Sequence, residues 1–255
     1  MSGPNPEQLF DMTDRVAIVT GGSRGLGLSI ARILAGAGAR VVIASRKREA
    51  CEEAARIVES EGGSSLPIAC HMGEPDQIRR LVEETTAQCG RLDCVVNNAA
   101  LGLRMRLADF DEGAWDKTMS VNLRGPIQLM HAAVPHLEQS DAASIVNILS
   151  IGGIRGSQSL LGYGSAKAAL EHATQSVAAE LGPRGIRVNA IAPGPFRTDM
   201  LGSGGAALEA EMASKTLLGR IAEPDEIMGV ALFLASRASS FVTGAVYVVD
   251  GGVIA

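Results

Sequence analysis

Short apolar runs and longer amphipathic segments alternate along the whole chain. The short runs are rich in Val and Ile without polar alternation, which is typical of strands covered by helices on both faces. They predict seven strands, at residues 16–20, 40–44, 66–70, 92–96, 144–149, 187–192 and 245–249. The segments between them predict helices over residues 26–37, 48–60, 76–88, 114–137, 163–181 and 224–235.

This alternation predicts an α/β fold: a Rossmann-type, doubly wound parallel sheet of about seven strands, flanked by helices on both faces. No linker-like stretch or internal repeat interrupts the rhythm, so we expect one domain over residues 1–255. Residues 1–14 are polar and proline-bearing, and we expect a flexible N-terminal tail there. The Gly- and Ala-rich segment at about 200–215 is expected to be a substrate loop or lid.

Composition and charge exclude several classes of protein. A net charge of −5 and a pI near 5.5, with no basic stripe, argue against a nucleic-acid partner. No apolar run approaches the roughly 20 residues that span a bilayer, and the start does not suit a secretory signal, so we expect a cytoplasmic protein without a membrane partner. The four cysteines and four histidines lack metal-ligand spacing, so we expect no metal site.

A glycine-rich turn directly follows the first predicted strand. Residues 20–27 read Thr-Gly-Gly-Ser-Arg-Gly-Leu-Gly and open an apolar helix. Such a turn lets backbone N–H groups approach a diphosphate, and the helix N-terminus adds partial positive charge. An ordinary strand-to-helix turn is the alternative. The position after a first strand and before a helix favours nucleotide binding.

The end of the second predicted strand bears on the choice of nucleotide. NAD-specific sites usually place an acid there, which bonds the ribose 2′-OH and repels a 2′-phosphate. This chain has Ser45, Arg46 and Lys47 instead, with Arg24 in the glycine turn. Two charge-assisted contacts of ~1.5–3 kcal/mol each would favour NADPH by roughly 10²–10⁴. We therefore expect NADP(H) rather than NAD(H); the alternative is that Arg46 and Lys47 only face solvent.

Tyr163 and Lys167 stand four residues apart at the start of a predicted helix, on one face. A nearby ammonium group would stabilise a phenolate and lower the phenol pKa from its reference value of ~10. Tyr163 could then exchange a proton with a substrate oxygen. Ser150 ends the fifth predicted strand, where its hydroxyl could hold that oxygen. A Tyr-x-x-x-Lys pair alone is common on helix surfaces, so its place among the other motifs matters.

The ordered set of motifs resembles the short-chain dehydrogenase/reductase family. It runs from the TGxxxGxG turn through Asn97-Asn98-Ala99, Asn122, Ser150 and the Tyr163–Lys167 pair to Pro193-Gly194, over nearly the whole chain. The resemblance implies an oxidoreductase that moves hydride between a nicotinamide cofactor and a carbonyl or alcohol. It assigns catalysis to Asn122, Ser150, Tyr163 and Lys167. In the family the asparagine kinks its helix and holds a water linked to the lysine.

The resemblance also implies where the cofactor lies. In the family the segment after strand four contacts the adenosine side, the Pro-Gly turn after strand six holds the nicotinamide end, and the lysine grips the nicotinamide ribose. Many members have an acid after strand three that bonds the adenine amine; here Cys-His-Met-Gly at 70–73 replaces it, similar to an NADPH-dependent carbonyl reductase branch. The expected cofactor contacts are Gly21, Ser23, Arg24, Gly25, Leu26, Gly27, Ser45, Arg46, Lys47, His71, Met72, Asn98, Ala99, Tyr163, Lys167, Pro193, Gly194 and Thr198.

We therefore expect NADPH-dependent reduction of a ketone or aldehyde, with 3-oxoacyl, steroid-like and other apolar carbonyls all open. Leu101, Leu103 and Met105 would add an apolar wall, and Arg155 could bind an anionic group or face solvent. Two alternatives remain: an NAD-dependent alcohol dehydrogenase, and a nucleotide-sensing binding protein without turnover. Small residues on the Tyr163 helix would permit packing between subunits, so we expect a homotetramer or homodimer.

Overall fold

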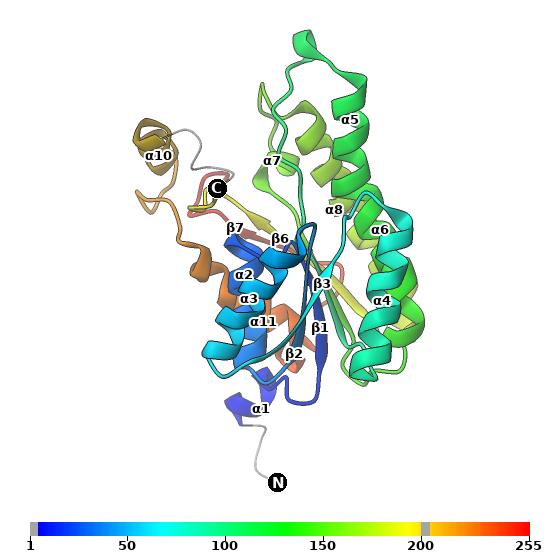
Figure 1. Cartoon of the computed structure of the whole chain (residues 1–255). Coiled ribbons are helices and arrows are strands. Elements are labelled where there is room, and N and C mark those ends of the chain that lie inside the picture. The colour runs from blue at the N-terminus through cyan, green and yellow to red at the C-terminus, as the bar shows by residue number, and fades with distance from the viewer. Residues whose placement is uncertain (1–4, 200–204) are drawn as a thin grey trace.

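The computed structural model describes residues 5–199 and 205–255. Seven strands form one parallel sheet in the order β3-β2-β1-β4-β5-β6-β7 (Figure 1). They are β1 (Val16–Thr20), β2 (Arg40–Ser45), β3 (Ser64–Ala69), β4 (Cys94–Asn97), β5 (Ser144–Ile148), β6 (Arg187–Pro193) and β7 (Val246–Val249). The strand order reverses between β1 and β4, where such sheets bind ligands beyond their carboxyl ends. The predicted doubly wound α/β fold is confirmed.

Helices cover both faces of the sheet (Figure 1). One layer holds α2 (Gly25–Gly36), α3 (Arg48–Ser60) and α11 (Met228–Ala235), and the other holds α4 (Pro75–Cys89), α6 (Gly125–Leu137) and α8 (Leu161–Leu181). In β1, Ala17 and Val19 face the first layer, whereas Val16 and Ile18 face the second. A strand buried on both faces must be apolar at every position, which explains the unbroken Val/Ile runs.

The remaining elements are short. They are α1 (Pro6–Phe10), η1 (Leu107–Asp109), α5 (Glu112–Met119), η2 (Ser120–Arg124), α7 (Ile151–Ile154), η3 (Gly182–Arg184), α10 (Gly205–Ser214), η4 (Pro224–Ile227) and η5 (Arg237–Ser239). Within the two described ranges, no helix is long and apolar enough to cross a membrane.

The helix predicted over residues 114–137 is not one regular helix. A π-helical turn, η2, separates α5 from α6. The Gly125 N–H bonds to the Ser120 carbonyl, five residues back instead of four, so one extra residue is accommodated in that turn. Such π turns are rare and occur frequently at functional sites. This one contains Asn122, which is fully buried.

The prediction for the N-terminal segment also needs correcting. Residues 6–10 form α1, which Asn5 caps by accepting the Glu7 N–H at 3.3 Å, while the Gln8 side chain accepts the Asn5 N–H at 3.2 Å. Met12 is 3% exposed and lies in the core. The prediction of a flexible tail as far as residue 14 therefore does not hold for this part. The sequence signal is the Asn-Pro-x-Gln start, a variant of a capping box.

Candidate active site

The glycine turn after β1 would allow a ligand to approach its backbone closely. Gly21 and Gly25 have φ of +64° and +52°, a region that L side chains rarely adopt. A Cβ on Gly27 would lie 2.2 Å from the Gly21 carbonyl oxygen. The turn leads into α2, twelve residues long, whose first backbone N–H groups have no partner within the helix. The turn therefore has the shape and the partial charge that a diphosphate requires.

Thr20 and Asn98 join this turn to the segment after β4. The Thr20 hydroxyl accepts the N–H groups of Asn98 and Ala99 at 3.0 and 3.1 Å, and donates to the Val96 carbonyl at 3.2 Å. The Asn98 amide donates to the Thr20 carbonyl at 2.8 Å. The Asn98 side-chain NH2 group thus already donates hydrogen bonds within the protein. A contact of Asn98 with a cofactor would come from its side-chain oxygen or its backbone.

The predicted 2′-phosphate residues are only partly brought together. Ser45 ends β2 and its hydroxyl accepts that of Ser23 at 3.0 Å, so the glycine turn touches this strand end. Arg46 and Lys47 are exposed and form no ion pair in the described part of the chain. Arg24, in contrast, pairs with Asp199 at 2.9 Å, with both side chains about 70% exposed. Arg46 and Lys47, rather than Arg24, are therefore the free cations at this strand end.

The turn after β3 contains His71 and Met72. His71 is half-buried, and its Nδ1 accepts the Gly73 N–H at 3.0 Å. The Met72 side chain is 4% exposed and belongs to the core beneath α4 and α6. A cofactor contact predicted for Met72 can come only from its backbone. The lack of a side chain on Gly125 lets α6 approach the Met72 carbonyl, since a Cβ there would lie 2.1 Å from that oxygen.

The segment after β6 borders the other side of the glycine turn. Pro193 ends the strand, and Gly194 passes so close to Asp250 that a Cβ would lie 2.5 Å from the Asp250 Cβ. The Thr198 methyl group lies beside Gly25, 3.5 Å from where a Cβ would be. Thr198 thus lies beside the glycine turn, and its contact with the cofactor stays a prediction.

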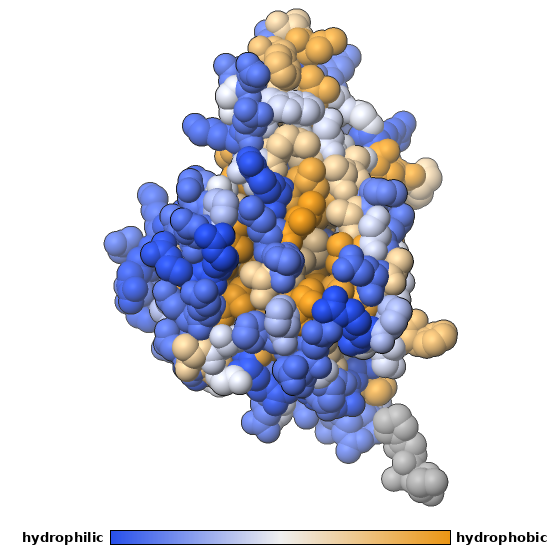
Figure 2. Space-filling model, turned by 90° about the vertical axis from the view of Figure 1, so that its right-hand side faces the viewer, coloured by the Kyte–Doolittle hydropathy of each residue, from blue (hydrophilic) through white to orange (hydrophobic). Residues whose placement is uncertain are grey.

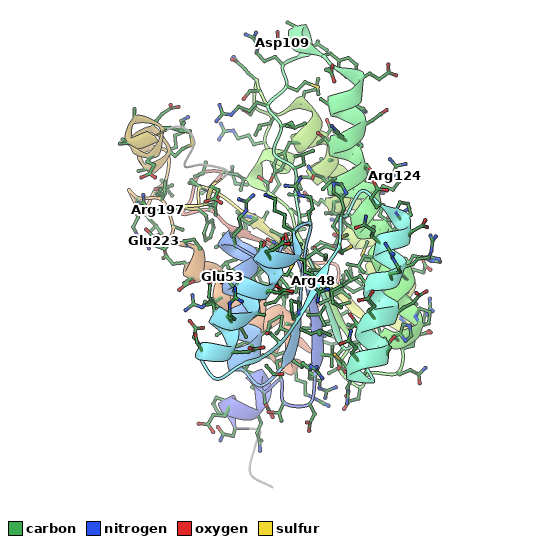
Figure 3. All side chains as sticks on the ribbon, in the orientation of Figure 1. Arg48, Glu53, Asp109, Arg124, Arg197 and Glu223 are labelled. Atoms are coloured by element: carbon green, nitrogen blue, oxygen red, sulfur yellow. The ribbon has the colours of Figure 1, made fainter. Side chains whose placement is uncertain are left out.

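Arg197 connects this segment to α10. Its guanidinium pairs with Glu209 of α10 and, at 2.9 Å, with Glu223 (Figure 3). No side chain of α10 is buried. Of the loop predicted at about 200–215, residues 200–204 lie outside the described residues and the rest is mainly this helix, held by an ionic contact.

Ser150, Tyr163 and Lys167 converge at the carboxyl end of β5. Ser150 follows the strand and caps α7, its Oγ accepting the Gly152 N–H at 3.1 Å. Tyr163 and Lys167 lie on the first turns of α8 and are 8% and 2% exposed. The Lys167 Nζ lies 5.8 Å from the centroid of the Tyr163 ring and donates to the Ile148 carbonyl at 2.6 Å. The cation and the phenol are therefore neighbours, on the edge where a ligand would lie.

The electrostatics of this cluster differ from expectation. Burial raises the pKa of Tyr163 above its ordinary value, and its hydrogen bond with Ser150 only partly opposes this. Burial also lowers the pKa of Lys167 to about 8, and no carboxylate of the described residues pairs with it. Desolvation is thus the dominant effect on the phenol pKa, and the expected lowering by the ammonium group is not found. At neutral pH Tyr163 is protonated and able to donate.

Asn122 has a defined structural task. Its Oδ1 accepts the Leu101 N–H at 2.7 Å and its Nδ2 donates to the Leu101 carbonyl at 2.9 Å. The π turn thereby holds the loop that follows β4. Further along, the Met105 N–H bonds to the Ser159 carbonyl at 2.8 Å and the Leu161 N–H to the Met105 carbonyl at 3.2 Å. The loops beside Ser150 and Tyr163 are therefore fixed to each other, which no local sequence pattern indicated.

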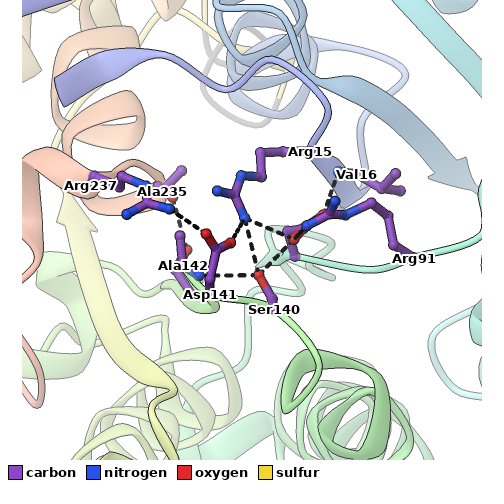
Figure 4. Close-up of polar contacts among 10 residues, drawn as sticks. Arg15, Val16, Arg91, Ser140, Asp141, Ala142, Ala235 and Arg237 are labelled. Carbon is purple, nitrogen blue, oxygen red and sulfur yellow. Dashed lines mark hydrogen bonds and ion pairs between the residues drawn. The ribbon is translucent and has the colours of Figure 1, made fainter. Parts of the chain in front are cut away.

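A second polar cluster lies at the opposite end of the strands (Figure 4). Asp93 is buried just before β4 and binds Arg91, Arg15, the Ser140 hydroxyl and the Val16 N–H. Burial alone would raise the Asp93 pKa, but these hydrogen bonds outweigh it and lower the pKa. Asp141 pairs with Arg15 and Arg237. Ligands of such sheets bind beyond the carboxyl ends of the strands. We therefore interpret this cluster as structural: it holds together the loops at the amino ends of the strands.

Cys70 and Cys94 are buried free thiols. Burial raises the pKa of Cys70 to about 12 and that of Cys94 to about 11, so both thiols stay protonated near neutrality. Among the residues that the structure describes, no group of three or more His, Cys, Asp or Glu could hold a metal ion.

The comparisons with known proteins agree with this geometry. The family described as enoyl-(acyl carrier protein) reductase, a group of short-chain dehydrogenases/reductases, matches residues 21–254. The chain belongs to the short-chain dehydrogenase/reductase family. Human dehydrogenase/reductase SDR family member 4 is 36% identical over 94% of this chain and 88% of its own length. The 3-oxoacyl-(acyl-carrier-protein) reductase FabG of Chlamydia muridarum is 37% identical over 94% and 98%.

A solved structure of a relative has the same fold. Gluconate 5-dehydrogenase from Burkholderia cenocepacia, in complex with NADP and tartrate, superimposes with a TM-score of 0.92 at 34% identity, covering 98% of both chains. As a short-chain dehydrogenase/reductase, the protein is an NAD(P)-dependent oxidoreductase. The predicted family and enzyme class are confirmed.

Proposed function

We propose that the protein reduces an apolar ketone or aldehyde to an alcohol with NADPH, with Tyr163 as the proton donor. The observation that carries this is a buried, protonated phenol beside Lys167 and Ser150 at the carboxyl end of β5. When bound, the reduced nicotinamide supplies the hydride to the carbonyl carbon. Tyr163 Oη gives its proton to the carbonyl oxygen, which the Ser150 hydroxyl holds in place. Asn122 keeps the Leu101 loop against this site.

The glycine turn and its neighbours fit the cofactor. Gly21, Ser23, Gly25, Leu26 and Gly27 would hold the diphosphate at the start of α2, with Arg24 at its rim. Asn98 and Ala99 would contact the adenosine half of the cofactor. Pro193, Gly194, Thr198 and Lys167 would contact the nicotinamide half. The close approaches at Gly27 and Gly194 support this, because side chains there would displace the backbone that forms the site.

The preference for NADPH is proposed to come from Arg46 and Lys47. Both are exposed, lack carboxylate partners among the described residues and follow Ser45 at the end of β2. A 2′-phosphate would bring ~1.5–2 negative charges between them. We expect the Arg46→Ala/Lys47→Ala variant to bind NADPH roughly 10²-fold more weakly while NADH binding changes less than about threefold. Fluorescence titration measures both, and equal losses would reject this assignment.

The substrate class is proposed from the loops beside the site. Met105 is 5% exposed, and Leu101 and Leu103 are half-buried, so this wall is mainly apolar. Among the relatives, the dehydrogenase of Sinomonas cyclohexanicum, 36% identical, is named for the alcohol cis-4-hydroxycyclohexanecarboxylate, and FabG is named for a 3-oxoacyl carbonyl. A panel of 3-oxoacyl thioesters, cyclic ketones and steroid ketones, followed by loss of NADPH absorbance, tests the proposal; no turnover of any of them would contradict it.

A homo-oligomer is proposed from exposed apolar and small residues on α6, on α8 and at or near β7. Figure 2 shows a band of apolar residues on the side of the molecule that faces right in Figure 1. Ile127, on α6, is 41% exposed. On α8, Ala168 and Ala179 are exposed while Ala166 and Ala178 are buried within the fold. Val248, on the edge strand β7, and Phe241, in the segment before it, are also exposed. We expect light scattering to give the mass of a dimer or tetramer, and a monomer would refute this.

A further inference from the structure

A chain of hydrogen-bonded side chains runs through the core from β4 to α8, and the proposed function does not use it. The Asn97 Nδ2 donates to the Asn147 Oδ1 at 2.8 Å, and the Asn147 Nδ2 donates to the Thr174 hydroxyl at 2.9 Å. That hydroxyl in turn donates to the Leu170 carbonyl at 2.8 Å. Asn147 and Thr174 are fully buried. Buried polar groups destabilise a core unless they are hydrogen-bonded, so these side chains constrain each other's positions.

The bond between Asn147 and Thr174 joins α8 to β5. Another bond between these elements runs from the Lys167 Nζ to the Ile148 carbonyl, at 2.6 Å. Thr174 lies seven residues after Lys167, which is about two helical turns and ~10 Å further along the same face of α8. A single bond lets a helix pivot about that bond, whereas a second bond two turns away opposes the pivot. The Asn147–Thr174 bond therefore helps to fix the register of α8 on β5.

This register determines how two groups of the site meet. Ser150 directly follows the end of β5 and caps α7, whereas Tyr163 lies on the first turn of α8. The two side chains share a hydrogen bond. A shift of α8 along β5 would change the distance between their hydroxyl groups. A displacement of ~1 Å can slow a reaction about 10²-fold, even when it originates far from the reacting atoms.

We propose that Asn147 and Thr174 are positioning residues, which hold the Tyr163 hydroxyl at Ser150 in the geometry that proton transfer requires. This rests on the function proposed above. Both side chains are fully buried and bonded to other parts of the protein, so they act through α8 and β5. Loss of their bond should therefore lower kcat and leave the binding of substrate and NADPH nearly unchanged.

The test removes the Thr174 hydroxyl while keeping the shape of the side chain. Thr174→Val should lower kcat for carbonyl reduction about tenfold, while KM and the dissociation constant for NADPH stay within about threefold. Thr174→Ser keeps the hydroxyl and should retain kcat within about twofold. Rates are divided by the number of NADPH-binding sites found by fluorescence titration, so that misfolded protein is not counted. A loss in Thr174→Val of less than about threefold, or an equal loss in Thr174→Ser, would overturn the proposal.

Thr85 provides a matched control on α4. It is also a fully buried helix threonine, and its hydroxyl donates to the Leu81 carbonyl, four residues back, at 2.7 Å. Among the described residues, no side chain donates to this hydroxyl, in contrast to Thr174. Thr85→Val should therefore keep kcat within about twofold. A loss equal to that of Thr174→Val would show a general effect on the core and would overturn the proposal.

Asn147→Ala removes the same bond from the strand side, and it decides the question if Thr174→Val does not bind NADPH. It should lower kcat at least about tenfold, and adding Thr174→Val should lower kcat less than about twofold further, because the bond is already lost. Losses that multiply would overturn the proposal. Turnover that does not respond to these changes would reject the positioning role alone. If the unaltered protein reduced none of the carbonyls in the panel, the proposed function would fail, and this inference with it.

Discussion

Replacing Tyr163 with Phe is expected to lower kcat for carbonyl reduction about 10²–10⁴-fold, the usual loss when a positioned proton donor is removed. The variant removes only the hydroxyl from a ring that is 8% exposed and packed beside Lys167, so the fold should be retained. The dissociation constant for NADPH should change less than about threefold, because the lost group acts on the substrate oxygen. Steady-state rates and a fluorescence titration on the same preparation measure the two effects.

The chain offers a matched control for this experiment. Tyr247 is its only other tyrosine; it lies on β7 and packs edge-on against Phe233, with ring centroids 5.8 Å apart. Tyr247→Phe makes the same chemical change away from the proposed site and should keep kcat within about twofold. If Tyr163→Phe retained more than about a tenth of the activity, Tyr163 could not be the proton donor.

The fold was predictable because its signals are local and repeated. Each strand of a parallel sheet with helices on both faces must be apolar throughout, so β1, β2 and β5 stand out as Val/Ile runs without any long-range information. The order of the motifs along the chain then predicted which edge of the sheet carries the candidate site, since the ends of parallel strands meet at one edge. Predicted and observed element bounds accordingly differ by only one or two residues in most cases.

The contacts that shape the site were not predictable in this way. The Arg24–Asp199 pair joins residues 175 positions apart, and the Asn122–Leu101 contact depends on a π turn for which the hydrophobic period has no signature. The pKa of Tyr163 was wrongly predicted because sequence spacing shows that Lys167 is near but not that both groups are buried. Desolvation depends on the packed surroundings, which only the folded structure contains.

Replacing Lys167 with Met is expected to remove activity and yet stabilise the protein at pH 7. Lys167 is a buried cation without a carboxylate partner among the described residues, and burial lowers its pKa from 10.5 to about 8. Each pKa unit is worth ~1.4 kcal/mol, so keeping this side chain charged in the folded state costs about 3 kcal/mol. Met fills the same space without charge, although the Ile148 carbonyl loses a hydrogen bond worth about 1 kcal/mol. We expect the free energy of unfolding at pH 7 to rise by about 1–3 kcal/mol.

The pH dependence supplies the sharper test. Between about pH 8 and 10.5 the unfolded chain keeps the Lys167 proton while the folded protein has released it, so the free energy of unfolding rises with pH in this window. The gain is complete above about pH 10.5, is lost progressively as the pH falls towards 8, and is absent below that. Urea unfolding across this range should show the rise in the unaltered protein and in Lys117→Met, an exposed lysine on α5, but not in Lys167→Met. Parallel curves for all three would mean that Lys167 is solvated, and the charge beside Tyr163 would then be too well screened to assist proton transfer.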